Sequence, residues 1–317
     1  MGRYSSAART GYKILREQGV RRTAKEGAYF GWQQALGAYL RQTRPEGVNF
    51  FSEDWDVLLI LDACRVDLME SVCNQYDFLS TVESRNSNAT YSLGWLENTF
   101  PPLDEQMLET TGYVTANPFA DDLPEAVVDT LGLYEPLHQY AWDNDQNTVW
   151  AEPVTDHAIS AWRDNDLERL VVHYMQPHYP FRGEEWSRAQ SIEEWGEFNF
   201  EDEVWTLLRD RKIKRGEVWE AYRRNLEYVL ESVSLFLSAV NAETVAITAD
   251  HGNALGERGI YGHPPGVPLR CVQEVPWVTT DAERTTDYEP EEHYTNDTLS
   301  RQEKLAHLGY TEMPNES

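Results

Sequence analysis

Acidic and imidazole side chains follow an apolar run near residue 250. The segment TVAITADHGNALGERGIYGH places Asp250 and His251 after the run, with Gly252 next and Glu257 and His263 close behind. A carboxylate and an imidazole at one strand end can bind a divalent cation, and glycine lets the backbone approach the ion closely. A simple turn does not require this set of ligand types. The segment therefore predicts a metal site that contains Asp250 and His251.

Two more sets of polar residues follow apolar runs. In LLILDACRVD, Asp62 ends the run and Arg65 follows, and Asp62 is either part of a site or the cap of the next helix. In VVHYMQPHYPF, His173 lies inside the run and His178 lies beyond it between prolines. A histidine inside a run is more often a buried sheet residue, whereas one on a rigid loop can meet a substrate. We therefore expect His178, and not His173, to be functional.

These positions require a framework that brings strand ends together. From Asp56 onward, short apolar runs alternate with amphipathic stretches, which is typical of βα units around a mainly parallel sheet. Ligands of such sheets gather beyond the carboxyl ends of the strands. We predict an α/β fold with a mainly parallel central sheet flanked by helices, the longest helix covering 217–240. The predicted strands are 56–61, 78–82, 112–116, 169–175, 244–249 and 274–279.

The first fifty residues differ from the rest in charge. They hold nine Lys and Arg residues against three Asp and Glu, a net charge of +6, which leaves −33 on the remainder. We expect residues 1–50 to form a basic helical extension, 51–310 a catalytic α/β domain with an inserted excursion at 183–215, and 311–317 a tail. The extension either packs on the body or attaches to an anionic membrane or an acidic partner. Two basic amphipathic helices are predicted from the helical spacing of Tyr4, Ala8, Tyr12 and Leu15 and of Ala28, Trp32, Leu36 and Tyr39.

The overall composition limits the environment and the partners. The chain has 317 residues, 54 of them acidic and 27 basic, with 41% hydrophobic residues, so a folded protein with an acidic surface is expected. This composition resembles that of salt-in halophilic archaeal proteins, and the charge of −27 excludes nucleic acid as a partner. The three cysteines are not spaced as a zinc site or a disulfide framework, and no apolar run reaches the roughly 18 residues of a membrane span. We expect a cytoplasmic protein with peripheral contact at the inner membrane face through residues 1–45.

The order of these motifs resembles a known family. Asp62, the PHYPF segment around His178 and the ADHGN segment followed by YGH resemble the sulfatase-like branch of the alkaline phosphatase superfamily. The YxxNLxYV motif at 222–229 and HLGY at 307–310 extend the resemblance over about 55–310. It implies the same α/β fold, with Asp62 as the first metal carboxylate and Asp250 and His251 as paired ligands. It also implies that His178 and His263 contact the transferred group or a second metal.

The resemblance further implies a nucleophilic hydroxyl on the loop VESRNSNATYSLGWLENTF. Thr90 and Ser87 are both candidates, or both only cap and turn the chain. Thr90 is preferred because a helix should begin there, and a helix N-terminus favours an anionic oxygen. Ser87 fits the family's spacing. The sulfatase signature, a Cys or Ser followed by x-Pro-Ser-Arg, is absent, and no second set of ligands precedes the Asp-His pair, so one divalent ion (Mn, Zn, Mg or Ca) is expected.

The implied function is that of a metal-dependent hydrolase or transferase of phosphate esters that forms a Thr or Ser phospho-enzyme. His178 or His263 would protonate the leaving group, and Arg65 would contact the oxyanion, unless Arg65 is simply a helix residue. The expected substrate is a small-molecule, glycan or lipid-linked ester. The alternatives are a sulfatase, or a sulfatase-like protein that binds a ligand without catalysis.

Overall fold

The computed structural model describes residues 2–187 and 204–291, with side chains from residue 23 onward. The middle of the predicted excursion, the HLGY motif at 307–310 and the tail at 311–317 lie outside the described residues.

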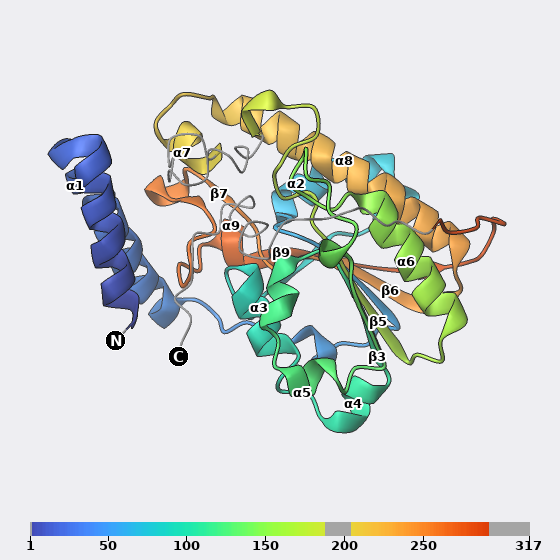
Figure 1. Ribbon diagram of the computed structural model, residues 1–317. Helices are drawn as coiled ribbons and strands as arrows, with labels where there is room; N and C mark the ends of the chain where they lie inside the picture. Colours follow the sequence, from blue (N-terminus) through green and yellow to red (C-terminus); the bar gives the residue numbers. More distant parts are fainter. Residues whose placement is uncertain (1, 188–203, 292–317) are drawn as a thin grey trace.

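A seven-stranded sheet forms the centre of the molecule, in the order β2-β9-β6-β1-β5-β3-β4 (Figure 1). The central strands are parallel, β9 runs antiparallel to β6, and β2 runs antiparallel to β9. The predicted fold class, a mainly parallel sheet flanked by helices, is confirmed. A separate ribbon pairs β7 (Ala254–Leu255) with β8 (Tyr261–Gly262). The seven strands are β1 (Val57–Leu61), β2 (Glu83–Asn86), β3 (Thr111–Thr115), β4 (Leu133–Pro136), β5 (Arg169–Tyr174), β6 (Ala242–Thr248) and β9 (Glu274–Ala282).

The central strands are mostly buried because helices cover both sides of the sheet. Helices α6 (Ala151–Asp164) and α8 (Arg215–Ala239) pack side by side on one side, with α2 (Val66–Glu70) nearby (Figure 1). Helices α3 (Ser92–Thr99), α4 (Glu105–Glu109) and α5 (Glu125–Val128) lie toward the other side. Short helices α7 (Val204–Arg209) and α9 (Arg270–Gln273) flank the β7-β8 ribbon. The long helix predicted at 217–240 is confirmed.

Two edge strands, β2 and β4, were not predicted correctly from the sequence pattern. The run 78–82 was predicted as a strand, but residues Asp77–Leu79 form a 3-10 turn with Leu79 buried, and the strand β2 follows at Glu83–Asn86. Strand β4 was not predicted. Both β2 and β4 lie at the edges of the sheet, where the side chains are half-buried or exposed and a continuous apolar run is not required.

Residues Gly2–Thr43 form a single helix, α1, and not the two helices predicted. Glycines at the expected break weaken a helix by only about 1 kcal/mol each, and no proline interrupts this one. Leu36 and Leu40 pack against Ile260, Val267 and other residues of the segment 254–272. Among the described helices, none is both long and apolar enough to cross a membrane.

Candidate functional site

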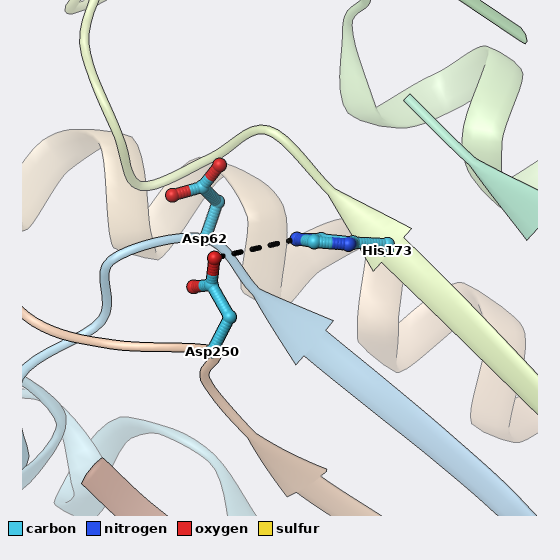
Figure 2. Close-up of side chains that lie close together, drawn as sticks. All are labelled: Asp62, His173 and Asp250. Carbon is cyan, nitrogen blue, oxygen red and sulfur yellow. Dashed lines mark ion pairs between the residues drawn. The ribbon is translucent and has the colours of Figure 1, made fainter. Parts of the chain in front are cut away.

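Three side chains from three neighbouring strands converge at the carboxyl edge of the sheet (Figure 2). Asp62 directly follows β1, Asp250 comes two residues after β6, and His173 is near the end of β5. The register pairs Ile60 with both His173 and Thr248, which brings the three positions to one edge. All three side chains are fully buried, and one potential ligand atom from each lies within 4.8 Å of the others.

Each carboxylate is fixed through one oxygen and leaves the other for the site. Asn117 Nδ2 donates to Asp62 Oδ2 at 3.1 Å, and the backbone amides of Ala63 and His251 donate to Asp250 Oδ1 at 3.0 and 2.9 Å. Among the residues that the structure describes, the second oxygens, Asp62 Oδ1 and Asp250 Oδ2, have no hydrogen-bond partner. Buried acceptors without a partner are costly, so the two oxygens fit a cation.

Two imidazoles complete this group. His173 Nδ1 lies 3.1 Å from the Tyr113 hydroxyl, while its Nε2 has no hydrogen-bond partner in the described part of the chain and lies 3.8 Å from Asp250 Oδ2. His251 Nε2 lies 3.4 Å from Asp250 Oδ2 and 3.7 Å from Asp62 Oδ1. Two carboxylates and two imidazoles form a donor set suited to Zn²⁺ or a related divalent ion. The sequence pattern had placed His173 in the sheet only, because its direction depends on a strand register that the sequence does not reveal.

A left-handed residue holds the turn after β1. Ala63 has φ of 61°, a conformation that costs a residue with a Cβ atom about 1 kcal/mol or more. This turn directs the Ala63 amide at Asp250, and the buried Tyr222 hydroxyl of α8 donates to the Ala63 carbonyl. The backbone strain is therefore held by contacts from two other elements, and it sets the position of Asp250 relative to Asp62.

The electrostatic balance of the group also favours a cation. Burial raises the pKa of Asp62 well above its usual value, and the charge of Asp250 raises it further. Burial acts to raise the pKa of Asp250 as well, but the neighbouring imidazoles together with hydrogen bonds from Ala63 and Ser92 outweigh it, and the pKa is lowered. Burial lowers the pKa of His173 to about 4, so this imidazole is neutral at neutral pH. A bound positive charge would let both carboxylates ionise beside the neutral His173 ring.

A serine hydroxyl faces this group from the first position of α3. Ser92 Oγ lies 3.2 Å from His251 Nε2, its side chain is fully buried, and it helps to lower the pKa of both Asp62 and Asp250. Tyr91, with φ of −165° and ψ of 154°, ends the extended chain just before it. The unpaired amides of a helix start favour negative charge on a nearby oxygen. The Ser92 hydroxyl thus lies at a helix N-terminus and close to the carboxylates of Asp62 and Asp250.

The two hydroxyls expected from the sequence have other partners. Thr90 Oγ1 accepts a hydrogen bond from the Gly266 amide at 3.0 Å, and Ser87 Oγ donates to the backbone carbonyl of Asp250. Both side chains hold loops around the site, and within the described residues neither hydroxyl hydrogen-bonds to the carboxylate oxygens of Asp62 or Asp250. Ser92 was missed because the helix was expected to begin two residues earlier, which made Thr90 its first hydroxyl.

Two further imidazoles lie next to His251. The ring of His263 is beside that of His251, and the ring of His178 is beside that of His263. His178 Nε2 lies 3.2 Å from His263 Nε2, and the rings of His263 and His251 are 4.3 Å apart. His178 Nδ1 donates to the carbonyl of Tyr179 at 2.7 Å, so in the neutral ring its Nε2 is an acceptor for His263. Burial lowers the pKa of His178 to about 4 and, together with His251, lowers that of His263 well below its usual value. Both rings are neutral at neutral pH.

Asn225 fixes the loop that carries His178. From α8, its Nδ2 donates to the carbonyls of Pro177, His178 and Pro180 at 3.3, 3.0 and 3.3 Å, and its Oδ1 accepts from the Arg182 amide at 3.1 Å. The side chain is buried. The Asn225 side-chain amide thus supplies hydrogen-bond partners for backbone groups of this loop, and it sets the position of His178.

Arg65 is engaged by the protein itself. Its Nε and Nη2 donate to the Asp67 carboxylate at 2.8 and 2.6 Å, and its Nη1 donates to Glu257 at 3.0 Å and to the Asn253 carbonyl at 2.7 Å. The guanidinium is buried and ties the turn after β1 to the loop after β6. These contacts favour the role of a structural helix residue over that of an oxyanion ligand.

Comparisons with known proteins find structural neighbours only. No protein-family model matches the sequence, and no curated protein is significantly similar to it. The C-terminal periplasmic domain of EcEptC from Escherichia coli, solved as a complex with Zn, aligns at 13% identity with a TM-score of 0.48, covering 76% of this chain and 77% of that one. The soluble domain of lipooligosaccharide phosphoethanolamine transferase A from Neisseria meningitidis aligns at 14% identity with a TM-score of 0.45, covering 72% and 76%. A protein in the alkaline phosphatase superfamily from Vibrio parahaemolyticus aligns at 12% identity with a TM-score of 0.41, covering 78% and 62%.

Proposed function

We propose that this protein is a metal-dependent hydrolase or transferase of phosphate esters, of the alkaline phosphatase superfamily, with Ser92 as its nucleophile. The observation that carries the proposal is the position of Ser92 Oγ, 3.2 Å from His251 Nε2 and beside two buried carboxylates. Phosphoryl transfer needs a nucleophile, a charged group that activates the nucleophile, and hydrogen-bonding groups nearby.

Asp62, Asp250, His251 and His173 are the proposed ligands of one divalent cation. In the described part of the chain, Asp62 Oδ1, Asp250 Oδ2 and His173 Nε2 are buried without a hydrogen-bond partner and fit such an ion, and His251 Nε2 lies beside both carboxylates. A cation there supplies positive charge that lowers the pKa of a nearby hydroxyl and compensates the charge of a phosphoryl oxygen. The Tyr113 hydroxyl against His173 Nδ1 orients that ring, as the outer partners of ligand histidines commonly do.

The reaction proceeds in two displacements. The Ser92 hydroxyl releases its proton to solvent, and its oxygen forms a bond to phosphorus while the bond from phosphorus to the leaving oxygen breaks; the leaving oxygen takes a proton from water. His178 and His263 are neutral, and the His178 Nδ1–H is used on the Tyr179 carbonyl while its Nε2 accepts from His263, so the pair fixes the loops beside the site and does not supply a strong acid. The oxygen of water, or of an acceptor hydroxyl, then forms a bond to phosphorus and loses its proton to solvent, while the bond from phosphorus to Ser92 breaks and the serine oxygen regains a proton. Water as the second nucleophile gives a hydrolase, and an alcohol gives a transferase.

Sulfate esters are the second candidate substrates, because a sulfuryl group has the same tetrahedral oxygen arrangement. The missing sulfatase signature places them behind phosphate esters. A purely binding role is disfavoured, because it leaves the buried, unsatisfied oxygens of Asp62 and Asp250 without a purpose. The proposed substrate is a phosphate ester of a small molecule, a glycan or a lipid.

Elemental analysis of purified protein, followed by assays on a panel of phosphate and sulfate esters, tests this function. We expect about one divalent ion per chain. Treatment with a chelator should abolish phosphate-ester cleavage, and addition of one kind of divalent metal should restore it. The assays should be run at high and low salt because of the charge of −27. Full activity of thoroughly chelated protein would refute metal dependence. Cleavage of sulfate esters only would favour the second candidate.

A further inference from the structure

An uncharged stretch interrupts this highly charged protein. Charged residues make up 26% of the chain, yet residues 27–40 of α1 contain none. Among the described residues, the large hydrophobic side chains with high exposure also belong to this part of the chain. Their exposed fractions are 51% for Phe30, 48% for Trp32, 59% for Tyr39 and 38% for Val48. We call Phe30, Trp32 and Tyr39 the aromatic patch.

The attachment of α1 to the body leaves the aromatic patch outside. Leu36 and Leu40 enter the apolar cluster with residues of 254–272, and Tyr29 accepts a hydrogen bond from the Tyr261 amide. Trp32 is anchored by one edge only, where its Nε1 donates to the Arg258 carbonyl at 2.9 Å. The side of α1 that faces the body is therefore already filled, and Phe30 and Tyr39 take no part in it.

Small residues lie between the aromatic side chains on the outer side of the helix. Trp32 and Tyr39 are seven residues apart and share one flank, whereas Phe30 lies on the other flank. Gly27 and Gly31 lie between the two flanks, and a Cβ atom at either position would meet nothing within 4 Å. The outer side is thus a shallow, uncharged strip bordered by aromatic rings, a shape that suits a flat surface.

The charge of the helix identifies the surface as anionic. Residues 1–50 carry +6 and the remainder −33, so an anionic surface attracts the helix and repels the body. Basic residues lie near both ends of the uncharged stretch, with Arg22 and Lys25 before it and Arg41 and Arg44 after it, and the one acidic neighbour, Glu26, is paired with Arg209. Lys25 pairs with Asp210, and Arg41 donates to the Gly266 carbonyl. Aromatic residues between basic ones are typical of segments at a lipid–water interface. The stretch 27–40 is shorter than the roughly 17–25 residues of a membrane span, so it would lie on the bilayer.

We propose that α1 docks the protein on an anionic lipid surface, with the aromatic patch at the lipid–water interface and the acidic body directed away. The proposal is independent of the proposed function. A second copy of the chain is the competing occupant of the same strip, and it is treated as an outcome of the test.

Co-sedimentation with vesicles tests the proposal. Full-length protein is mixed with vesicles of phosphatidylglycerol and phosphatidylcholine, or of phosphatidylcholine alone, at the lowest salt concentration that keeps its circular dichroism native. The test variant is Phe30→Glu/Tyr39→Glu. The control variant, Gln106→Glu/Ala126→Glu, adds the same charge at exposed positions of α4 and α5. Light scattering of each protein without lipid gives the oligomeric state.

We expect full-length protein to sediment with the anionic vesicles and to stay in solution with the neutral ones. The test variant should bind at least about tenfold more weakly, and the control variant should bind like the native chain. Failure to bind anionic vesicles, equal binding by the test variant, or a lipid-independent dimer that only the test variant disrupts would each overturn the proposal. Asp62→Asn should bind vesicles normally even if it is inactive, so this result and the proposed function can fail separately.

Discussion

Replacing Ser92 by alanine is the sharpest test of the proposed chemistry. The substitution removes the one hydroxyl that contacts His251 Nε2 at 3.2 Å while keeping the volume and the start of α3. Loss of a catalytic nucleophile lowers kcat by on the order of 10⁴- to 10⁶-fold, which is about 5–8 kcal/mol of transition-state stabilisation. The cost in folding stability should be only about 1 kcal/mol, because one hydrogen-bonding group is removed.

Thr90→Val is the matched control for Ser92→Ala. It leaves the Gly266 amide without its acceptor, so it should lower stability by about 1–3 kcal/mol yet keep kcat within about tenfold of the native value. Ser87→Ala serves in the same way, because the Ser87 hydroxyl donates to the backbone of Asp250. Ser92→Ala is thus expected to reduce mainly kcat, whereas Thr90→Val and Ser87→Ala are expected to reduce mainly folding stability.

The assay combines steady-state cleavage of a chromogenic phosphate ester, thermal unfolding and metal content for each protein. Mass spectrometry after rapid acid quenching should find the phosphoryl group on the peptide that contains Ser92. Retention of native kcat by Ser92→Ala, with the activity lost instead in Thr90→Val at unchanged metal content, would show that the assignment is wrong. A phosphoryl group on Thr90 or Ser87 would lead to the same conclusion.

Asp62→Asn should weaken metal binding by more than about 100-fold, and Tyr113→Phe, which removes the partner of His173 Nδ1, by about tenfold; calorimetric titration of metal-free protein measures both. Asn225→Leu should reduce phosphate-ester cleavage at unchanged metal content, because it releases the His178 loop, and Asn225→Asp should do the same, because its carboxylate cannot donate to the three loop carbonyls. Full activity of Asn225→Leu would contradict this positioning role. The pKa of His178 falls from 6.5 to about 4 on folding, so protonation favours the unfolded chain and stability is lost as pH falls through that window. The excess stability of native protein over His178→Gln in urea titrations should therefore shrink by on the order of 3 kcal/mol between pH 7 and pH 4, and a constant difference would refute the shift.

The sequence was most informative where burial constrains it. Strands β1, β5 and β6 are buried and apolar, so their ends, and hence Asp62 and Asp250, could be located from the pattern alone. The edge strand β2 has no such constraint, so a strand was predicted at 78–82 and not at Glu83–Asn86. Ser92 was missed because the start of α3 was predicted at Thr90. The role of His173 depended on which way its side chain points and on which strand lies beside it, and neither is a local property of the sequence.

The pairing of β2 with β9 also has a consequence for the synthesis of the chain. Strand β2 has β9 as its neighbour in the sheet, the Ser87 amide donates to the Gln273 carbonyl at 2.8 Å, and Asp250 follows β6. A polypeptide growing from its N-terminus therefore contains Asp62 and Ser92 long before their partners exist. Nascent chains and fragments that end before β9 contain the serine but cannot hold it against the acidic pair. The proposed activity therefore depends on the synthesis and pairing of β9, although β9 itself contributes none of the proposed catalytic residues.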